Sequence, residues 1–148
     1  MRAVVQRVRR AAVTVDGRVT GQIAHGLLVF AGVARGDGPA DLDYIASKVR
    51  ELRVFPDDRG RMNRSLGESG GGLLVVSQFT LMGDVRKGRR PAFDSAAAPD
   101  EARVTFEALI ERLRAGGPVE TGIFQAHMNV EIENDGPVTI LLDSRRLF

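Results

Sequence analysis

Two short apolar runs constrain the fold of this chain more than any other feature of its sequence. They are residues 26–33 (GLLVFAGV) and 73–81 (LLVVSQFTL). Apolar runs of this length predict strands buried in the interior of a sheet. No apolar run approaches the ~20 residues that would span a bilayer, and the basic, alternating N-terminus is unlike a signal peptide. We therefore expect a soluble, cytoplasmic domain built around a central sheet.

Two amphipathic helices are predicted, each opened by a proline in its first turn, where the missing N–H is harmless. The first begins at Pro39, and the second begins at Pro99 and ends before Gly116-Gly117. Apolar residues recur at helical spacing in both segments. They are Leu42, Ile45, Val49 and Leu52 in the first helix and Val104, Leu109, Ile110 and Leu113 in the second.

The other predicted strands lie toward the two ends of the chain. Asp16-Gly17 is a dipeptide typical of two-residue hairpins, and residues 134–137 (NDGP) are typical of a turn. Residues 56–72 form a polar, glycine-rich connection, and residues 83–98 form a long loop that is first basic and then rich in alanine. The order of elements predicts one α/β domain over residues 1–148, with a mixed sheet and two main helices on one side. The terminal strands are expected over residues 3–8, 11–15, 18–23, 124–133 and 138–142.

Composition excludes several kinds of chemistry. The chain has 148 residues, no cysteine and two histidines. Disulfides, thiolate nucleophiles and Cys-ligated zinc are therefore ruled out, as is a three-histidine metal site, and we expect no metal and no cofactor. The net charge is +2 and the pI is about 9.6. This mildly basic balance is typical either of a well-solvated surface or of a protein that contacts a polyanion.

The second apolar run ends in polar side chains, in the segment Ser77-Gln78-Phe79-Thr80-Leu81. If the strand continues through this segment, Gln78 and Thr80 lie on one face and the other three residues on the opposite face. One interpretation is that Thr80 is a β-branched strand residue with a satisfied hydroxyl. The alternative is that the strand end opens into a pocket, where the N–H groups of Phe79 and Thr80 face a developing oxyanion.

Two motifs resemble the signature motifs of the D-aminoacyl-tRNA deacylase family: SQFTL at 77–81 and NDGPVT at 134–139. On its own the second motif is typical of a plain turn, and nothing local makes Pro137 cis. The likeness extends along the whole chain, because further segments resemble the family in order and spacing. These are MRAVVQRV, DGRVTGQIAHGLLVFAGV, the MN at 62–63, GRRPAF at 88–93 and HMNVEIENDGPVT.

The resemblance implies a homodimer with its active sites at the subunit interface, and a barrel-like sheet layered as α/β/β. It implies that Gly136-Pro137 is cis and projects into the partner's site, where its carbonyls reject L-amino acids sterically. It implies that Arg7 holds that peptide in orientation and that Met128 lies near the pocket wall. The pocket for the ester and the terminal adenosine of tRNA would be lined by Ser77, Gln78, Phe79 and Thr80.

The implied reaction is hydrolysis of the ester between a D-amino acid and tRNA. This ester is already activated, so the enzyme must position a water, stabilise the oxyanion and select chirality. In the family a neighbouring ribose hydroxyl assists, so we expect Thr80 to bind substrate or position water before acting as a nucleophile. The catalytic contribution expected of Phe79 comes from its backbone. A wall that excludes L side chains should accept many D-amino acids, and glycine in mischarged glycyl-tRNA.

Two positions depart from the family pattern: Ala92 stands where we expect serine, and Gln125 where we expect glycine. Neither lies in the two motifs.

A set of alternating polar residues near the second motif favours a solvent-facing strand surface, with acid–base chemistry or a metal as the alternative. The set is His127, Asn129, Glu131 and Glu133.

The basic loop, defined here as Arg86, Lys87, Arg89 and Arg90, has two interpretations. It is either a solvated loop or a contact for phosphates of the tRNA acceptor end.

A non-catalytic RNA-binding module is an alternative function, although one Tyr and no Trp provide few aromatics for base stacking. A hydrolase of free D-aminoacyl or N-acyl esters is another. The expected partner is tRNA, with no DNA and no membrane.

Overall fold

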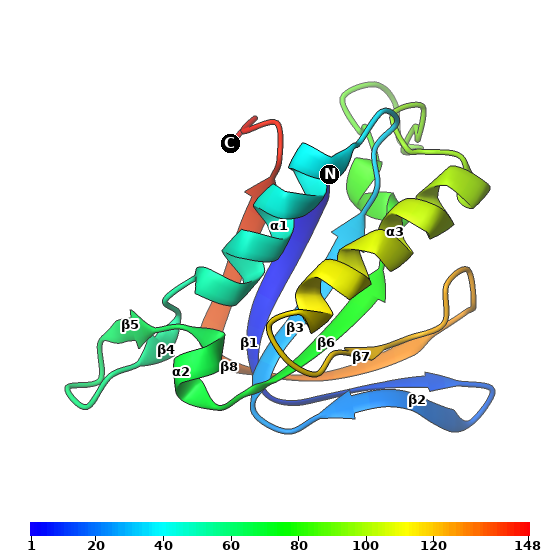
Figure 1. Ribbon diagram of the computed structural model, residues 1–148. Helices are drawn as coiled ribbons and strands as arrows, with labels where there is room; N and C mark the ends of the chain where they lie inside the picture. The colour runs from blue at the N-terminus through cyan, green and yellow to red at the C-terminus, as the bar shows by residue number, and fades with distance from the viewer.

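The computed structural model describes residues 1–148 and shows a curled sheet with two long helices, α1 and α3, on one side (Figure 1). No helix has the length and apolar character needed to cross a membrane. In chain order the elements are β1 (Arg2–Val15), β2 (Arg18–Ile23), β3 (Gly26–Gly32), α1 (Pro39–Glu51), β4 (Phe55–Pro56), β5 (Met62–Arg64), α2 (Leu66–Ser69), β6 (Gly72–Ser77), the 3-10 helix η1 (Phe79–Met82), α3 (Pro99–Arg114), β7 (Glu120–Thr121) and β8 (Asn129–Asp143).

The sheet is organised around β1, which pairs antiparallel with β2, β3 and β8. β3 pairs parallel with β6, and β6 pairs parallel with β7, so the sheet is mixed, as predicted. It curls until β7 meets β2. A Cβ on Gly21 would stand 2.4 Å from the carbonyl oxygen of Thr121, so this approach requires glycine. The prediction of a barrel-like sheet is confirmed.

Alternation along β3 and β6 divides the core into two layers. One face packs beneath α1 and α3, and the other packs within the curled sheet against β1. The strand β3 and residues 73–76 of β6 are therefore packed on both faces, which gives the predicted α/β/β layering. The helix side holds Leu27, Val29, Leu73 and Val75, and the inner side holds Leu28, Leu74 and Val76.

The two predicted helices are confirmed, with one error in the stripe of α3. Val104 is 68% exposed, whereas Phe106 and Ala102 are buried with Leu109 and Leu113. The reason is the helical period: positions 102, 106, 109 and 113 fall on one face, and Val104 falls on the other. In α1 the buried positions Leu42, Ile45 and Val49 agree with the prediction, whereas Leu52 follows the helix as its half-buried C-cap residue.

The strands at the two ends of the chain, β1 and β8, are longer than the local sequence pattern predicts. β1 is one strand of 14 residues, not two segments. The hairpin from β1 to β2 is confirmed, with positive φ at both Asp16 (49°) and Gly17 (77°), as a two-residue turn of this kind requires.

The polar connection 56–72 contains structure that was not predicted, namely the β4–β5 pair and α2. The connection 83–98 contains no helix or strand, as expected.

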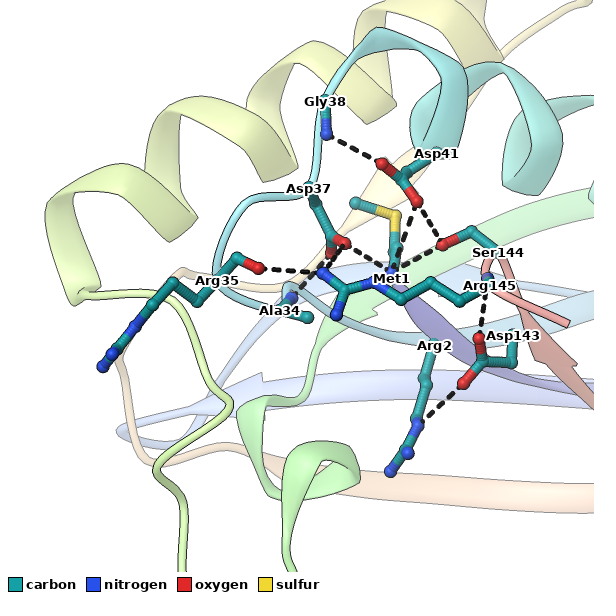
Figure 2. Close-up of polar contacts among 10 residues, drawn as sticks. All are labelled: Met1, Arg2, Ala34, Arg35, Asp37, Gly38, Asp41, Asp143, Ser144 and Arg145. Atoms are coloured by element: carbon teal, nitrogen blue, oxygen red, sulfur yellow. Dashed lines mark hydrogen bonds and ion pairs between the residues drawn. The ribbon is translucent and has the colours of Figure 1, made fainter. Parts of the chain in front are cut away.

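A buried polar cluster joins the start of β1 to the loop before α1 and to the end of β8 (Figure 2). The Met1 α-ammonium group donates hydrogen bonds to Asp37 Oδ1 and Ser144 Oγ, each at 2.7 Å. Ser144 Oγ donates in turn to Asp41 Oδ1 at 2.6 Å. The side chains of Met1 and Asp37 are 0% exposed. This cluster therefore fixes three distant parts of the chain around a buried charge pair.

Burial and hydrogen bonding have opposite effects on the pKa of the Asp41 carboxyl in this cluster. Burial raises the pKa, because it disfavours the charged form. Hydrogen bonds from the Gly38 N–H and the Ser144 hydroxyl, together with the nearby Met1 ammonium, lower it. The net result is a pKa below the ordinary value, so Asp41 stays ionised beside the ammonium group.

Candidate active site

The segment SQFTL does not continue the strand. β6 ends at Ser77, and the chain turns into η1. The prediction of a strand as far as Leu81 is therefore wrong, and so is the assignment of alternate side chains to its two faces. The turn is possible because Gln78 crosses the end of β3 at a glycine: a Cβ on Gly32 would stand 2.7 Å from the Gln78 carbonyl oxygen.

This turn leaves backbone donors exposed at the end of β6. The first hydrogen bond of η1 runs from the Leu81 N–H to the Gln78 carbonyl at 3.3 Å. The N–H groups of Phe79 and Thr80 precede it and have no partner within the helix, and no side chain caps η1. Both residues are exposed. These two donors are the ones for which the sequence suggested an oxyanion-binding role.

The Thr80 hydroxyl is held by its neighbour. Gln78 Nε2 donates a short hydrogen bond to Thr80 Oγ1. This bond occupies the hydroxyl oxygen as an acceptor and leaves its proton available for donation. No histidine or carboxylate forms a hydrogen bond with Thr80, so no base contacts the hydroxyl. The arrangement therefore suits a donor more than a nucleophile, which requires a base in contact.

A cavity of about 610 Å³ opens beside Phe79. Its walls come from the end of β6, the start of α3 and the segment between β7 and β8, which lie on one side of the molecule (Figure 1). The structure brings together four residues predicted for the site: Ser77, Gln78, Phe79 and Met128. Thr80 does not line the cavity itself but lies beside it through Gln78.

The segment before β8 supplies a wall that the sequence did not predict. β8 begins at Asn129, so the prediction of a strand from residue 124 is wrong. Phe124, Gln125 and His127 line the cavity instead. His127 is exposed, as expected, but it belongs to this wall and not to a strand surface. The one local signal in the sequence was Gln125, which replaces the glycine expected there. In the structure Gln125 has a left-handed backbone with φ of 64°.

The segment NDGPVT is a bulge inside one strand and not a turn between two strands. β8 pairs with β1 on both sides of it, through Val8↔Asn134 and Gln6↔Thr139. One residue of β1 therefore faces four of β8, residues 135–138, which must bulge out of the ladder. The Gly136-Pro137 peptide bond in this bulge is cis, and both residues are exposed.

Two side chains fix the bulge to the sheet. The Arg7 guanidinium donates to the Asp135 carbonyl at 3.0 Å and also to the carbonyl of Val54. Asn134 brackets the bulge, because its Oδ1 accepts from the Val138 N–H at 2.9 Å and its Nδ2 donates to the Val138 carbonyl at 3.2 Å. The sequence resemblance indicated Arg7. Asn134 was missed, although asparagine commonly bonds nearby backbone in this way.

Arg7, Gly136 and Pro137 lie together, but they do not line the cavity of their own chain. The predicted site residues therefore form two separate groups. One group surrounds the cavity beside η1, and the other forms the exposed bulge of β8. A single chain does not bring the two groups into one site.

The basic loop is closed by backbone hydrogen bonds between Asp84 and Ala92 in both directions, at 2.8 and 2.9 Å. These bonds do not involve the Ala92 side chain, so the loop closes without the expected serine. Arg86 pairs with Asp84 at 2.6 Å. This contact holds the pKa of the Asp84 carboxyl well below its ordinary range and raises the pKa of Arg86. None of the four loop cations lines the cavity.

Two solved structures share the layered, nearly closed sheet of this chain. A solved structure titled "c-Myc DNA Unwinding Element Binding Protein" matches with a TM-score of 0.92 and 39% identity, covering 97% of this chain and 98% of that one. Another, titled as a probable eukaryotic D-amino acid tRNA deacylase, matches with a TM-score of 0.78 and 19% identity, covering 95% and 97%. The second likeness shows a shared fold.

Sequence comparison then defines the family. The family model described as D-Tyr-tRNA(Tyr) deacylase matches residues 4–143. D-aminoacyl-tRNA deacylases of Symbiobacterium thermophilum and Anaeromyxobacter dehalogenans are each 60% identical to this chain over 149 residues. Each alignment covers 100% of this chain, with 99% and 100% of the two relatives respectively. The chain belongs to the D-aminoacyl-tRNA deacylase family.

Proposed function

We propose that this chain hydrolyses the ester bond of D-aminoacyl-tRNA in the cytoplasm and releases a free D-amino acid and tRNA. Membership of the family supports the activity. The structural observation that carries the proposal is the pair of N–H groups at Phe79 and Thr80, left without a partner in η1 at the edge of an apolar cavity. Backbone donors placed where charge develops can stabilise an acyl-transfer intermediate without reorganising.

In the proposed reaction a water oxygen attacks the ester carbonyl, and the carbonyl electrons move onto the oxyanion. The N–H groups of Phe79 and Thr80 donate hydrogen bonds to that oxygen. The intermediate then collapses, the bond to the ribose oxygen breaks, and the ribose oxygen takes up the proton that the attacking water loses. The Thr80 hydroxyl donates to the water or the substrate, because its oxygen already accepts from Gln78. Ser77 and Met128 shape the cavity around the ester and the terminal nucleoside.

The active unit that we infer is a homodimer. The bulge of β8, with Gly136-Pro137 at its exposed tip, does not reach the cavity of its own chain. It can complete that cavity only from a second copy. Exposed apolar side chains on β8 support such a contact: Ile132 is 42% exposed and Leu141 is 58% exposed. In the dimer the main-chain carbonyls of the bulge would exclude an L side chain and admit a D side chain or glycine, so glycyl-tRNA is a further substrate.

We expect Asn134→Ala to lower the preference for D- over L-aminoacyl-tRNA by about tenfold or more, since it removes the side-chain hydrogen bonds to Val138 and Thr139, each worth roughly 1 kcal/mol. The contacts of Arg7 and Arg9 with Asp135 would remain. The measurement is the ratio of kcat/KM on the two substrates. Asn129→Ala, at the exposed start of the same strand, is the matched control. A preserved ratio in the Asn134 variant would show that its side chain does not hold the wall.

The basic loop gives a separate prediction for tRNA binding. Replacing Lys87, Arg89 and Arg90 by glutamate should weaken tRNA binding and flatten its dependence on salt. The log–log slope should fall by about 0.7–0.9 for each phosphate that the loop no longer neutralises. Arg86→Gln should have less effect, because Asp84 already pairs with Arg86. Binding measured between 50 and 200 mM salt, roughly the range over which such interactions weaken, tests this. An unchanged slope would identify the loop as solvated surface.

The substrate class is tested by comparing two matched esters. Purified protein is incubated with D-aminoacyl-tRNA and, separately, with the methyl ester of the same D-amino acid, and ester loss is followed over time. We expect strong acceleration for the tRNA ester alone. Equal efficiency on the free ester would favour a general D-ester hydrolase. Binding of tRNA with no ester loss would favour the RNA-binding module.

A further inference from the structure

One arginine contacts the wall of the cavity. Arg103 lies on α3, and its Nη2 donates a hydrogen bond to Gln125 Oε1 at 2.9 Å. The guanidinium also lies over the Phe124 ring, with Cζ 4.8 Å from the ring centroid. Gln125 and Phe124 both line the cavity. No other lysine or arginine donates a hydrogen bond to a cavity-lining side chain or stacks on one.

The charge of Arg103 is not neutralised within the chain. Its partners are a neutral amide and an aromatic ring, and no carboxylate lies within ion-pair distance. By contrast, Arg112 and Arg114 on the same helix pair with Asp43 and Glu111. A guanidinium has five N–H donors, and only one of those of Arg103 is used. The ring and the amide therefore hold Arg103 in place while its charge and most of its donors stay available.

The conformation of Gln125 supports a role for this contact. Its φ of 64° lies in the left-handed region, which glycine adopts freely and other residues adopt under strain. Glycine is also the residue that we expect at this position in the family. The side chain that replaces it places its amide oxygen on Arg103. Gln125 therefore has a strained backbone at the cavity wall and a side chain that orients the Arg103 guanidinium.

We propose that Arg103, held by Gln125 and Phe124, binds a phosphodiester group of the RNA strand whose terminal ester occupies the cavity. This inference rests on the proposed function and names a binding residue for it. A cavity of about 610 Å³ is large enough for a nucleoside with an attached amino acid. The next phosphodiester then lies outside the cavity wall, and a guanidinium fork matches two phosphate oxygens.

Arg103 is better placed for this contact than the basic loop. It touches two residues of the cavity wall, whereas no cation of the loop lines the cavity. The loop is then left with the more distant phosphates of the acceptor end. The two sites predict different effects. Removal of the Arg103 charge should weaken binding of the 3′ end of the RNA, and removal of the loop charges should weaken binding of whole tRNA.

The test compares Arg103→Gln with the unchanged protein on two substrates. D-aminoacyl-tRNA carries phosphodiesters, and 3′-O-D-aminoacyl-adenosine carries none. We expect KM for the tRNA substrate to rise about tenfold, kcat to stay unchanged, and the log–log salt slope to fall by about 0.7. Cleavage of the adenosine ester should be unaffected. Arg103→Lys should restore part of the affinity, and Arg114→Gln is the matched removal of charge on the same helix.

Three outcomes would overturn the inference. An unchanged KM and salt slope in Arg103→Gln would mean that Arg103 contacts no phosphate. An equal loss on both substrates would mean that Arg103 only supports the cavity wall. Equal losses in Arg103→Gln and Arg114→Gln would indicate a nonspecific effect of charge. Binding of a short single-stranded RNA with the 3′ sequence of tRNA provides a readout that needs no catalysis. If the unchanged protein binds this RNA through Arg103 but cleaves no ester, the proposed function fails and the phosphate site stands.

Discussion

Phe79→Pro is expected to lower kcat on D-aminoacyl-tRNA by about 10²–10³-fold, the usual effect of removing one oxyanion donor. Proline removes the N–H of residue 79 and leaves the backbone path intact. Position 79 is the first residue of η1, where proline is tolerated. Gln78 has φ of −145° and ψ of 83°, which lies outside the α region that is disfavoured for a residue before proline.

Phe79→Ala is the matched control, because it removes the same ring and keeps the N–H group. The ring is 59% exposed and packs edge-on against Phe93, with 5.1 Å between centroids. Its loss should therefore affect KM more than kcat and should alter stability little. Circular dichroism and thermal unfolding would confirm that both variants fold. Equal losses of kcat in the alanine and proline variants would mean that the ring, and not the backbone donor, serves the reaction.

The second large effect concerns stability. Asp37→Ala is expected to lower the free energy of unfolding by about 3–5 kcal/mol, the usual cost of removing one partner of a buried ion pair, because the Asp41 carboxylate that remains lies farther from the ammonium group, at 4.0 Å. Asp37 Oδ1 accepts from the Met1 ammonium at 2.7 Å, and Oδ2 accepts from the Ala34 N–H at 2.6 Å. Arg145 reaches the same carboxylate at 3.3 Å. All three donors would be left without this acceptor in the variant (Figure 2).

Urea unfolding of the Asp37 variant beside Asp43→Ala tests this prediction. Asp43 lies on α1 and pairs with Arg112, but its side chain is 67% exposed, so its loss should cost less than about 1 kcal/mol. Asp37→Asn keeps an acceptor oxygen without the charge and should fall between the two. A loss in Asp37→Ala no larger than that in Asp43→Ala would show that the buried pair contributes little net stability.

Local signals in the sequence were sufficient for much of the fold. The hairpin at Asp16-Gly17 depends on the conformations of two adjacent residues, and both helices depend on a proline start with an apolar stripe. The buried strands followed from their apolar length. The error at Val104 arose because a stripe chosen by residue type alone ignored the phase of the helix, which Phe106 and Leu109 define.

The errors at the two motifs have a different origin. Strand propensity predicts that Phe79 and Thr80 continue β6, but the chain turns away, and the room for that turn is left by Gly32 on a neighbouring strand. Likewise, NDGP predicts a turn locally, whereas Arg7 on β1 and the pairing on both sides make it a bulge. These contacts join residues far apart in sequence, so periodicity within a short window cannot contain them.

The candidate site was predictable only in part for the same reason. The motif SQFTL directed attention to Ser77, Gln78 and Phe79, which do line the cavity. The opposite wall comes from α3 and from residues around Gln125, and only the folded chain brings these close to the end of β6. Gln125 was visible in advance as a departure from an expected glycine. Its contact with Arg103 was not visible, because the two residues are 22 positions apart and lie on separate elements.

The central claim is that a chirality-selective deacylase operates through backbone groups, with the wall supplied by a second subunit. The most direct test is the rate of ester loss from D- and L-aminoacyl-tRNA carrying the same amino acid and the same tRNA, measured side by side with purified protein. We expect rapid loss of the D ester and a rate on the L ester close to the spontaneous one. Equal acceleration of both, or of neither, would contradict the account.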